Sequence, residues 1–103
     1  MKNPFNEMQE LLRDRADLQA RLRLMPYDGT PEIKTRGNVK YLYIRKRVSG
    51  KLTSTYVGVY TDELYNLLLR NATEARQIRK EMRKVEKRLL QLGYSEDELS
   101  VAV

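Results

Sequence analysis

The chain contains no cysteine, no histidine and no tryptophan. The absence of cysteine and histidine excludes a disulfide framework, a thiolate nucleophile, a zinc-finger ligand set and a histidine general base. The sequence also has no long apolar run, and residues 1–7 lack the apolar stretch of a signal peptide. We therefore expect a cytoplasmic protein that has no membrane helix, no metal site and no cofactor.

Features typical of enzymes are also scarce. No pair of carboxylates lies in an apolar segment where the two groups would act as acid and base. Gly50 and Gly58 are too far apart to form a nucleotide-binding loop. We predict that the protein is not an enzyme.

Positive charge is what the sequence has in excess. The 103 residues include 20 lysines and arginines against 14 acids, which gives a formal net charge of +6. Hydrophobic residues make up 41% and charged residues 33%, as expected for one small domain, residues 1–103, with a well-solvated surface. A basic surface of this kind favours a nucleic acid or an acidic protein surface as the partner.

The first segment, residues 3–25, is predicted to be a helix. Asn3 is a suitable N-cap, Pro4 suits the first helical position, and Pro26 ends the helix because it has no backbone N–H to donate. An apolar stripe, interrupted by Arg15, follows helical spacing. Its members are Met8, Leu11, Leu18, Leu22 and Met25.

Residues 32–60 are predicted to form a two- or three-stranded antiparallel sheet, with 32–35 as a short edge strand. Ser49 and Gly50 are typical of a two-residue hairpin loop, which would pair Val48 with Lys51. Counting back from the loop predicts the pairs Arg45–Ser54, Ile44–Thr55, Tyr43–Tyr56, Leu42–Val57 and Tyr41–Gly58. One face of the sheet would then carry Leu42, Ile44, Val57 and Val59, and the other Tyr41, Tyr43, Tyr56 and Tyr60 with Arg45 and Arg47.

Residues 61–92 are predicted to form one long helix. Thr61 is a good N-cap, and Gly93 fits a left-handed C-cap. The apolar seam alternates steps of four and three, and its second half needs a cover, either the first helix or a second copy in a homodimer. We predict a short turn and a tail over 95–103. The predicted partner seam consists of Ile78, Met82, Val85, Leu89 and Leu92.

The whole pattern predicts an α+β fold with a basic hairpin and a long basic helix. On a sheet, arginines beside tyrosines would bind phosphates while the tyrosine rings stack on bases. On the helix, like charges four residues apart repel one another, and a polyanion opposite them would offset this repulsion. Two plainer interpretations stay open: tyrosine is common in strands, and charged runs often form the solvated face of a helix. The predicted nucleic-acid-binding residues are Lys40, Tyr41, Tyr43, Arg45, Lys46, Arg47, Lys51 and Tyr56 in the hairpin and Arg76, Arg79, Lys80, Arg83, Lys84, Lys87 and Arg88 in the helix.

Two families resemble parts of this pattern. The first is the arm-type DNA-binding domain of tyrosine recombinases. It is similar to residues 32–69 or so, where three predicted strands, with a basic hairpin at 41–51, are followed by a helix. This resemblance implies a sheet that enters the major groove. The second is the accessory segment that precedes the catalytic domain in some bacterial Fic proteins, which residues 40–94 resemble. The resemblance is strongest at 56–67 and at the predicted helix end, Leu92-Gly93-Tyr94. Because the chain has no histidine, this second resemblance transfers no catalytic residue.

These features predict a small, basic, non-enzymatic protein of a bacterium, phage or mobile element that binds DNA or RNA or associates with a nucleoprotein. The alternative is a protein–protein module, antitoxin-like, that regulates or inhibits a toxin, an effector enzyme or a defence complex through the partner seam.

Overall fold

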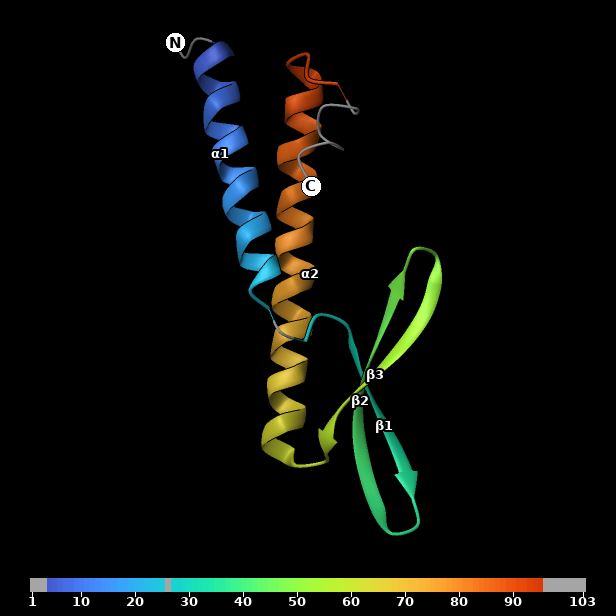
Figure 1. The fold of residues 1–103 in the computed structure, drawn as a ribbon. Coiled ribbons are helices and arrows are strands. Elements are labelled where there is room, and N and C mark those ends of the chain that lie inside the picture. The colour runs from blue at the N-terminus through green and yellow to red at the C-terminus, as the bar shows by residue number, and fades with distance from the viewer. Residues whose placement is uncertain (1–3, 26, 96–103) are drawn as a thin grey trace. The chain divides into compact units, whose positions relative to one another are not determined.

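The computed structural model describes residues 4–25 and 27–95 (Figure 1). It confirms the predicted α+β fold, with an N-terminal helix, a three-stranded antiparallel sheet and a long C-terminal helix. The predicted N-cap Asn3, the helix-ending Pro26 and residues 96–103 lie outside the described residues. The elements are α1 (Pro4–Arg23), β1 (Thr30–Arg36), β2 (Val39–Val48), β3 (Lys51–Val59) and α2 (Asp62–Gln91).

The chain divides into two compact units. Of the described residues, 4–24 and 77–95 form a helical unit, which contains α1 and the second part of α2. Residues 25 and 27–76 form a sheet unit, which contains the three strands and the first part of α2. Neither helix is long and apolar enough to cross a membrane within the described ranges.

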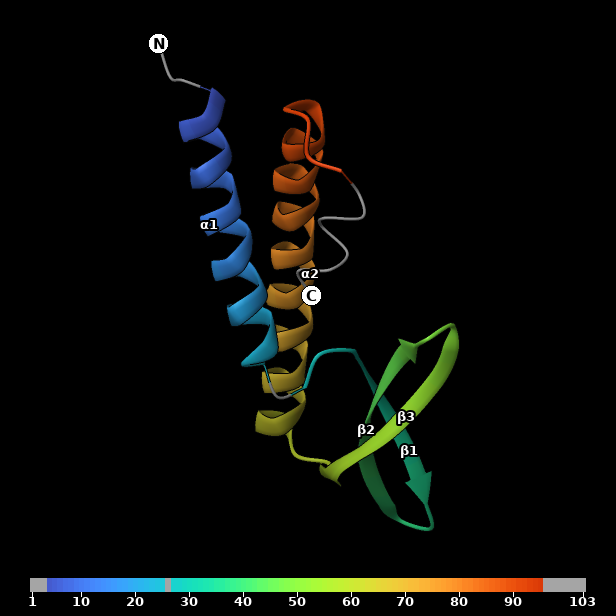
Figure 2. The same cartoon turned by 45° about the horizontal axis from the view of Figure 1, so that its top comes forward.

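In the helical unit, α1 lies antiparallel to the second part of α2 (Figure 2). Three residues of the predicted apolar stripes are buried, Leu18 of α1 and Ile78 and Leu89 of α2. α1 ends at Arg23 instead of continuing to residue 25. The physical reason is local, because the residue before a proline avoids the helical conformation.

The ends of α2 agree with the prediction. The Thr61 hydroxyl accepts a hydrogen bond from the Leu64 N–H at 3.0 Å, which is the N-cap contact. At the other end Gly93 has φ +105°. The Tyr94 N–H donates to the Leu89 carbonyl at 3.0 Å and the Gly93 N–H to the Leu90 carbonyl at 3.1 Å, which is the Schellman pattern.

The sheet has the order β1-β2-β3, so β2 is the central strand. Ser49 (φ +50°) and Gly50 (φ +79°) both lie in the left-handed region, as a type I′ turn requires. The predicted register is confirmed from Val48 opposite Lys51 as far as Tyr43 opposite Tyr56. The hairpin loop therefore determines the pairing over this half of the strands.

Beyond Tyr43 the predicted register is wrong by one residue. A β-bulge leaves Val57 as the extra residue, so that Leu42 faces Gly58 and Tyr41 faces Val59. In a regular strand, residues three apart point to opposite faces. Val57 and Tyr60 nevertheless both pack against the core, and the extra residue makes this arrangement possible.

The bulge exchanges the faces of Val59 and Tyr60. Val59, predicted on the aliphatic face, lies opposite Tyr41 and is 53% exposed. Tyr60, predicted in the tyrosine row, packs against the core instead. The core of the sheet unit consists of Leu42, Ile44 and Leu68, with Tyr27, Val57, Tyr60, Leu64 and Tyr65 packed around it.

The edge strand β1 is longer than predicted, because it begins at Thr30 and not at residue 32. Its loop to β2 consists of Gly37, with φ +61°, and Asn38. Pairing of Arg36 with Val39 across this two-residue loop places Lys34 opposite Tyr41 and Glu32 opposite Tyr43. These cross-strand neighbours belong to the site described below.

Gly29, just before β1, lies where no side chain fits. A Cβ atom at Gly29 would overlap the Ile44 side chain and lie 2.8 Å from the Arg45 carbonyl oxygen. We expect Gly29→Ala to lower the free energy of unfolding by about 1–3 kcal/mol in urea titration, the usual cost of overpacking. Gly58→Ala is the matched control, since its Cβ meets only Leu64, at 3.4 Å. Equal stability of the two variants would contradict the close approach at Gly29.

Candidate nucleic-acid interface

The side chains of the sheet that point away from the core form a surface that we call the tyrosine face. The strand register arranges it in successive rows across β1, β2 and β3. The rows are Arg36 and Val39; Lys34, Tyr41 and Val59; Glu32, Tyr43 and Tyr56; Thr30, Arg45 and Ser54; and Arg47 and Leu52.

Three tyrosines occupy the middle of this face. The ring centroids of Tyr43 and Tyr56 are 5.5 Å apart with an edge-to-face arrangement, and those of Tyr41 and Tyr56 are 6.2 Å apart. Both distances lie within the range of attractive aromatic pairs. Tyr41 and Tyr43 are half-buried, whereas Tyr56 is 53% exposed. Tyr56 is therefore the ring most available to a ligand.

Basic side chains lie on either side of the tyrosines. The Lys34 ammonium lies 4.3 Å from the centroid of the Tyr43 ring, a cation–π contact. The Arg47 guanidinium donates to the Gly50 carbonyl at 3.2 Å, which holds it beside the hairpin loop. Arg45 and Arg36 are exposed.

Glu32 is the one acid of segment 30–60, and it lies in the middle row. Its carboxylate oxygens are 3.6 Å from the Lys34 ammonium and 3.6 Å from the Arg45 guanidinium. Both pairs are open to solvent, so each stabilises the fold by at most about 1 kcal/mol. The same segment carries seven lysines and arginines. Its formal charge of +6 equals that of the whole chain, so the remaining residues are neutral in sum.

The other predicted hairpin cations lie on the opposite side of the sheet. The Lys40 ammonium is 5.7 Å from the centroid of the core-packed Tyr60 ring. The Lys46 ammonium is 3.5 Å from a carboxylate oxygen of Asp28, a residue near the core side of the sheet. Lys51 pairs with Val48 at the hairpin loop and is exposed. The structure thus places five of the eight hairpin residues together on the tyrosine face: Tyr41, Tyr43, Arg45, Arg47 and Tyr56.

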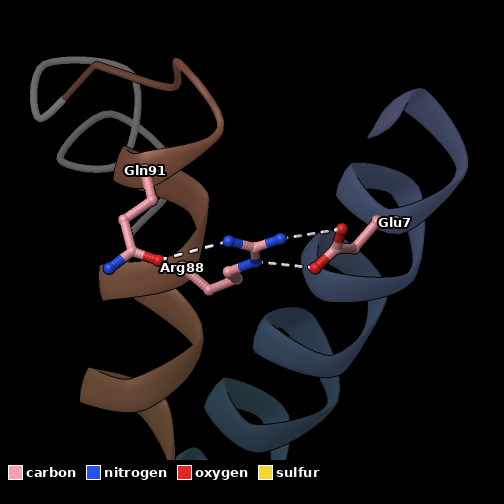
Figure 3. Close-up of polar contacts among 3 residues, drawn as sticks. All are labelled: Glu7, Arg88 and Gln91. Atoms are coloured by element: carbon pink, nitrogen blue, oxygen red, sulfur yellow. Dashed lines mark hydrogen bonds and ion pairs between the residues drawn. The ribbon is translucent and has the colours of Figure 1, made fainter. Parts of the chain in front are cut away.

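The predicted helical cations do not act as one set. Arg88 makes a two-pronged ion pair with Glu7 of α1, with Nε–Oε1 at 2.7 Å and Nη2–Oε2 at 3.1 Å (Figure 3). Nη1 of Arg88 also donates to the Gln91 side chain at 3.3 Å. The hydrogen bonds from Arg88 to Glu7, and then the negative charge of Glu7, raise the pKa of Arg88. Arg88 therefore ties α1 to α2. Arg79 is half-buried, whereas Arg76, Lys80, Arg83, Lys84 and Lys87 are exposed.

The predicted partner seam lies against α1 in the helical unit. Ile78 and Leu89 are buried, and Met82, Val85 and Leu92 are half-buried. Arg15, the polar interruption of the α1 stripe, is only 5% exposed and donates from Nε to Glu86 at 3.0 Å. This buried charge is matched by a partner on the other helix, which favours one register of the two helices.

An open groove of about 400 Å³ runs between the two helices of this unit. Its lining mixes both signs of charge, so it favours neither an anion nor a cation. No cluster of acids suited to a metal ion occurs within the described ranges. The lining residues are Asp14, Asp17, Leu18, Arg21, Glu81, Lys84 and Val85.

Tyr60 joins the sheet to the start of α2. Its hydroxyl donates to the Asp62 carboxylate at 2.8 Å, and its ring lies 5.8 Å from that of Tyr65. The hydrogen bond to Asp62, and to a smaller extent burial, raise the pKa of Tyr60. Tyr60 therefore acts in the structure of this corner and is not part of the tyrosine face.

Sequence reasoning missed Lys34, Arg36 and Glu32. These residues join the site only through the pairing of β1 with β2. The available signal was the Gly37-Asn38 dipeptide between two strand-like segments, because a two-residue loop there determines which residues face each other.

No curated protein and no solved structure matches the chain significantly. One family model does match, a domain of unknown function designated DUF6788, over residues 5–66. The matched part includes most of α1, all three strands and the start of α2, and so contains the whole tyrosine face. Because this match spans more than half of the chain, the protein belongs to the DUF6788 family.

Proposed function

We propose that this protein is a non-enzymatic nucleic-acid-binding protein that contacts its ligand through the tyrosine face. The observation that carries the proposal is the distribution of charge. Segment 30–60 holds a formal charge equal to that of the whole chain, and four of its seven cations lie on the tyrosine face around the three tyrosines. Concentrated positive charge next to aromatic rings suits a ligand that combines phosphates with bases.

The proposal includes a cytoplasmic location and an origin in a bacterium, phage or mobile element, as the sequence predicts. The resemblance to recombinase arm domains implies a duplex ligand, and the Fic resemblance implies an accessory role beside another protein. Both stay predictions for this chain, and the duplex ligand is the alternative against which the single strand proposed below is measured.

The alternative function, capture of a partner protein by the seam of α2, has less support. Ile78 and Leu89 are already buried in the helical unit. A protein partner, or a second copy forming a homodimer through the same seam, would have to displace α1 and break the Arg15–Glu86 and Arg88–Glu7 pairs.

The double variant Arg45→Ala/Arg47→Ala tests the proposed interface. We expect weaker binding to a labelled oligonucleotide and a slope of log affinity against log salt that is smaller by about 1.5, since each phosphate contact contributes about 0.7–0.9. Both side chains are exposed, so the melting temperature is expected to change by only a few degrees. Fluorescence anisotropy between 50 and 200 mM salt measures the slope.

Arg83→Ala/Lys87→Ala is the matched control. It removes the same charge from two exposed positions of α2. An equal loss of affinity in both double variants would show that only net charge matters and would contradict the assignment to the tyrosine face. Binding that is insensitive to salt would contradict a phosphate contact altogether.

A further inference from the structure

We propose that the ligand of the tyrosine face is a single-stranded nucleic acid, with a base stacked on Tyr56 and phosphates held by the cations at the two ends of the face. This inference rests on the proposed function and adds the class of nucleic acid. It follows from the order of side chains along the sheet, from the exposure of Tyr56 and from the position of Glu32.

The order of side chains along β2 separates basic from aromatic positions, and only Lys34 of β1 brings a cation into the aromatic rows. Along β2 the tyrosine face presents Tyr41 and Tyr43, then Arg45 and Arg47, and Arg36 of β1 lies at the opposite end from Arg47. Successive residues on one face of a strand are about 7 Å apart, so the cations at the two ends are separated by roughly the length of the strand. A flexible strand of nucleic acid can cross this distance with phosphates at both ends and bases between them.

The exposure of Tyr56 is the second argument. The chain has seven tyrosines. Tyr27, Tyr60 and Tyr65 pack against the core of the sheet unit, whereas Tyr56 has more than half of its surface in solvent. Stacking on such a ring requires a base whose own face is free, and in a duplex the bases are stacked on one another. A single strand provides free base faces, so an exposed ring flanked by cations favours it over a duplex.

The position of Glu32 is the third argument. Its carboxylate lies in the same row as Tyr43 and Tyr56, between the basic ends. A carboxylate repels phosphates but accepts hydrogen bonds from the N–H groups of bases, which in thymine and uracil is the ring N3–H. The middle of the face therefore suits bases and its ends suit phosphates, which is the arrangement expected when the bases of a single strand turn toward the sheet.

The absence of tryptophan makes a direct test available, because tyrosine then provides the intrinsic fluorescence of the protein. Titration of the full chain with a 12-nucleotide oligothymidylate and an oligouridylate should quench this fluorescence. A 12-base-pair DNA duplex should bind at least tenfold more weakly, at a salt concentration where both are measurable. Inorganic polyphosphate, which has charge but no bases, should bind without comparable quenching.

Substitution of Tyr56 locates the stack. We expect Tyr56→Leu to weaken binding of both single strands by about 5- to 100-fold, the effect of losing one base–aromatic stack. Tyr56→Phe, which retains the ring, should restore most of the affinity. Neither variant should change the binding of polyphosphate or the circular dichroism spectrum, since Tyr56 lies outside the core.

The outcomes separate the two proposals. If the duplex binds as tightly as the single strands, or if Tyr56→Leu binds them as well as the original protein does, the single-strand inference is wrong while nucleic-acid binding stands. If polyphosphate binds and neither single strand nor duplex binds better, both proposals fail. Binding of oligothymidylate and oligouridylate within a few-fold of each other is expected, because the two strands differ only in the sugar and in the 5-methyl group of thymine and both offer free base faces for stacking.

Discussion

Leu89→Asp is expected to unfold the helical unit. Leu89 is fully buried in this unit, so Leu89→Asp would place a carboxylate at a position without access to solvent. An unpaired charge in such a setting costs several kcal/mol, a large part of the total stability of a domain of this size. Loss of helical signal in far-ultraviolet circular dichroism, together with a lower melting temperature, measures the effect.

Leu90→Asp is the matched control, because the neighbouring side chain is 38% exposed. It introduces the same charge one residue further along α2 and should change the stability by less than about 1 kcal/mol. A folded monomer carrying Leu89→Asp would show that the second part of α2 stands free in solution. The seam would then be open to a partner, and the alternative function would gain the support that it lacks. Analytical ultracentrifugation distinguishes a monomer from a dimer.

Leu68→Ala should have the second largest effect, and it acts on the sheet unit. Leu68 is fully buried in the core with Leu42 and Ile44. Removing its side chain leaves a cavity between α2 and the sheet, for which a loss of about 2–5 kcal/mol in the free energy of unfolding is expected. Urea unfolding followed by tyrosine fluorescence reports on this unit, because six of the seven tyrosines lie in it.

The flanking leucines are the controls for this variant. Leu67 and Leu69 are each 40% exposed, so truncation to alanine should cost clearly less at either position. The three variants share composition and helix propensity, and they differ only in the direction of the lost side chain. A similar loss at all three positions would show that α2 does not pack on the sheet through Leu68.

The sequence by itself determined the order of the elements, both ends of α2 and the loop between β2 and β3. The N-cap at Thr61, the C-cap at Gly93 and the hairpin loop at Ser49-Gly50 depend on contacts between residues at most five apart. Local contacts of this kind depend on residue type and spacing, both of which are visible in the sequence. The register from Val48 to Tyr43 followed from the loop for the same reason.

Tertiary packing decided which residues share the tyrosine face. The core accepts both Val57 and Tyr60, and the bulge that allows this places Val59 beside Tyr41 and removes Tyr60 from the row. No local rule predicts such a bulge, because its cause is the burial of two side chains against a helix that follows later in the chain.

Pairing between distant segments decided the rest. Lys34 and Arg36 joined the face when β1 paired with β2, and Arg88 left the predicted basic set when it paired with Glu7, 81 residues away. The sequence shows which side chains carry charge, but the folded chain determines which charges neutralise one another. A close two-pronged ion pair such as that of Arg88 with Glu7 weakens the attraction of the cation for a ligand.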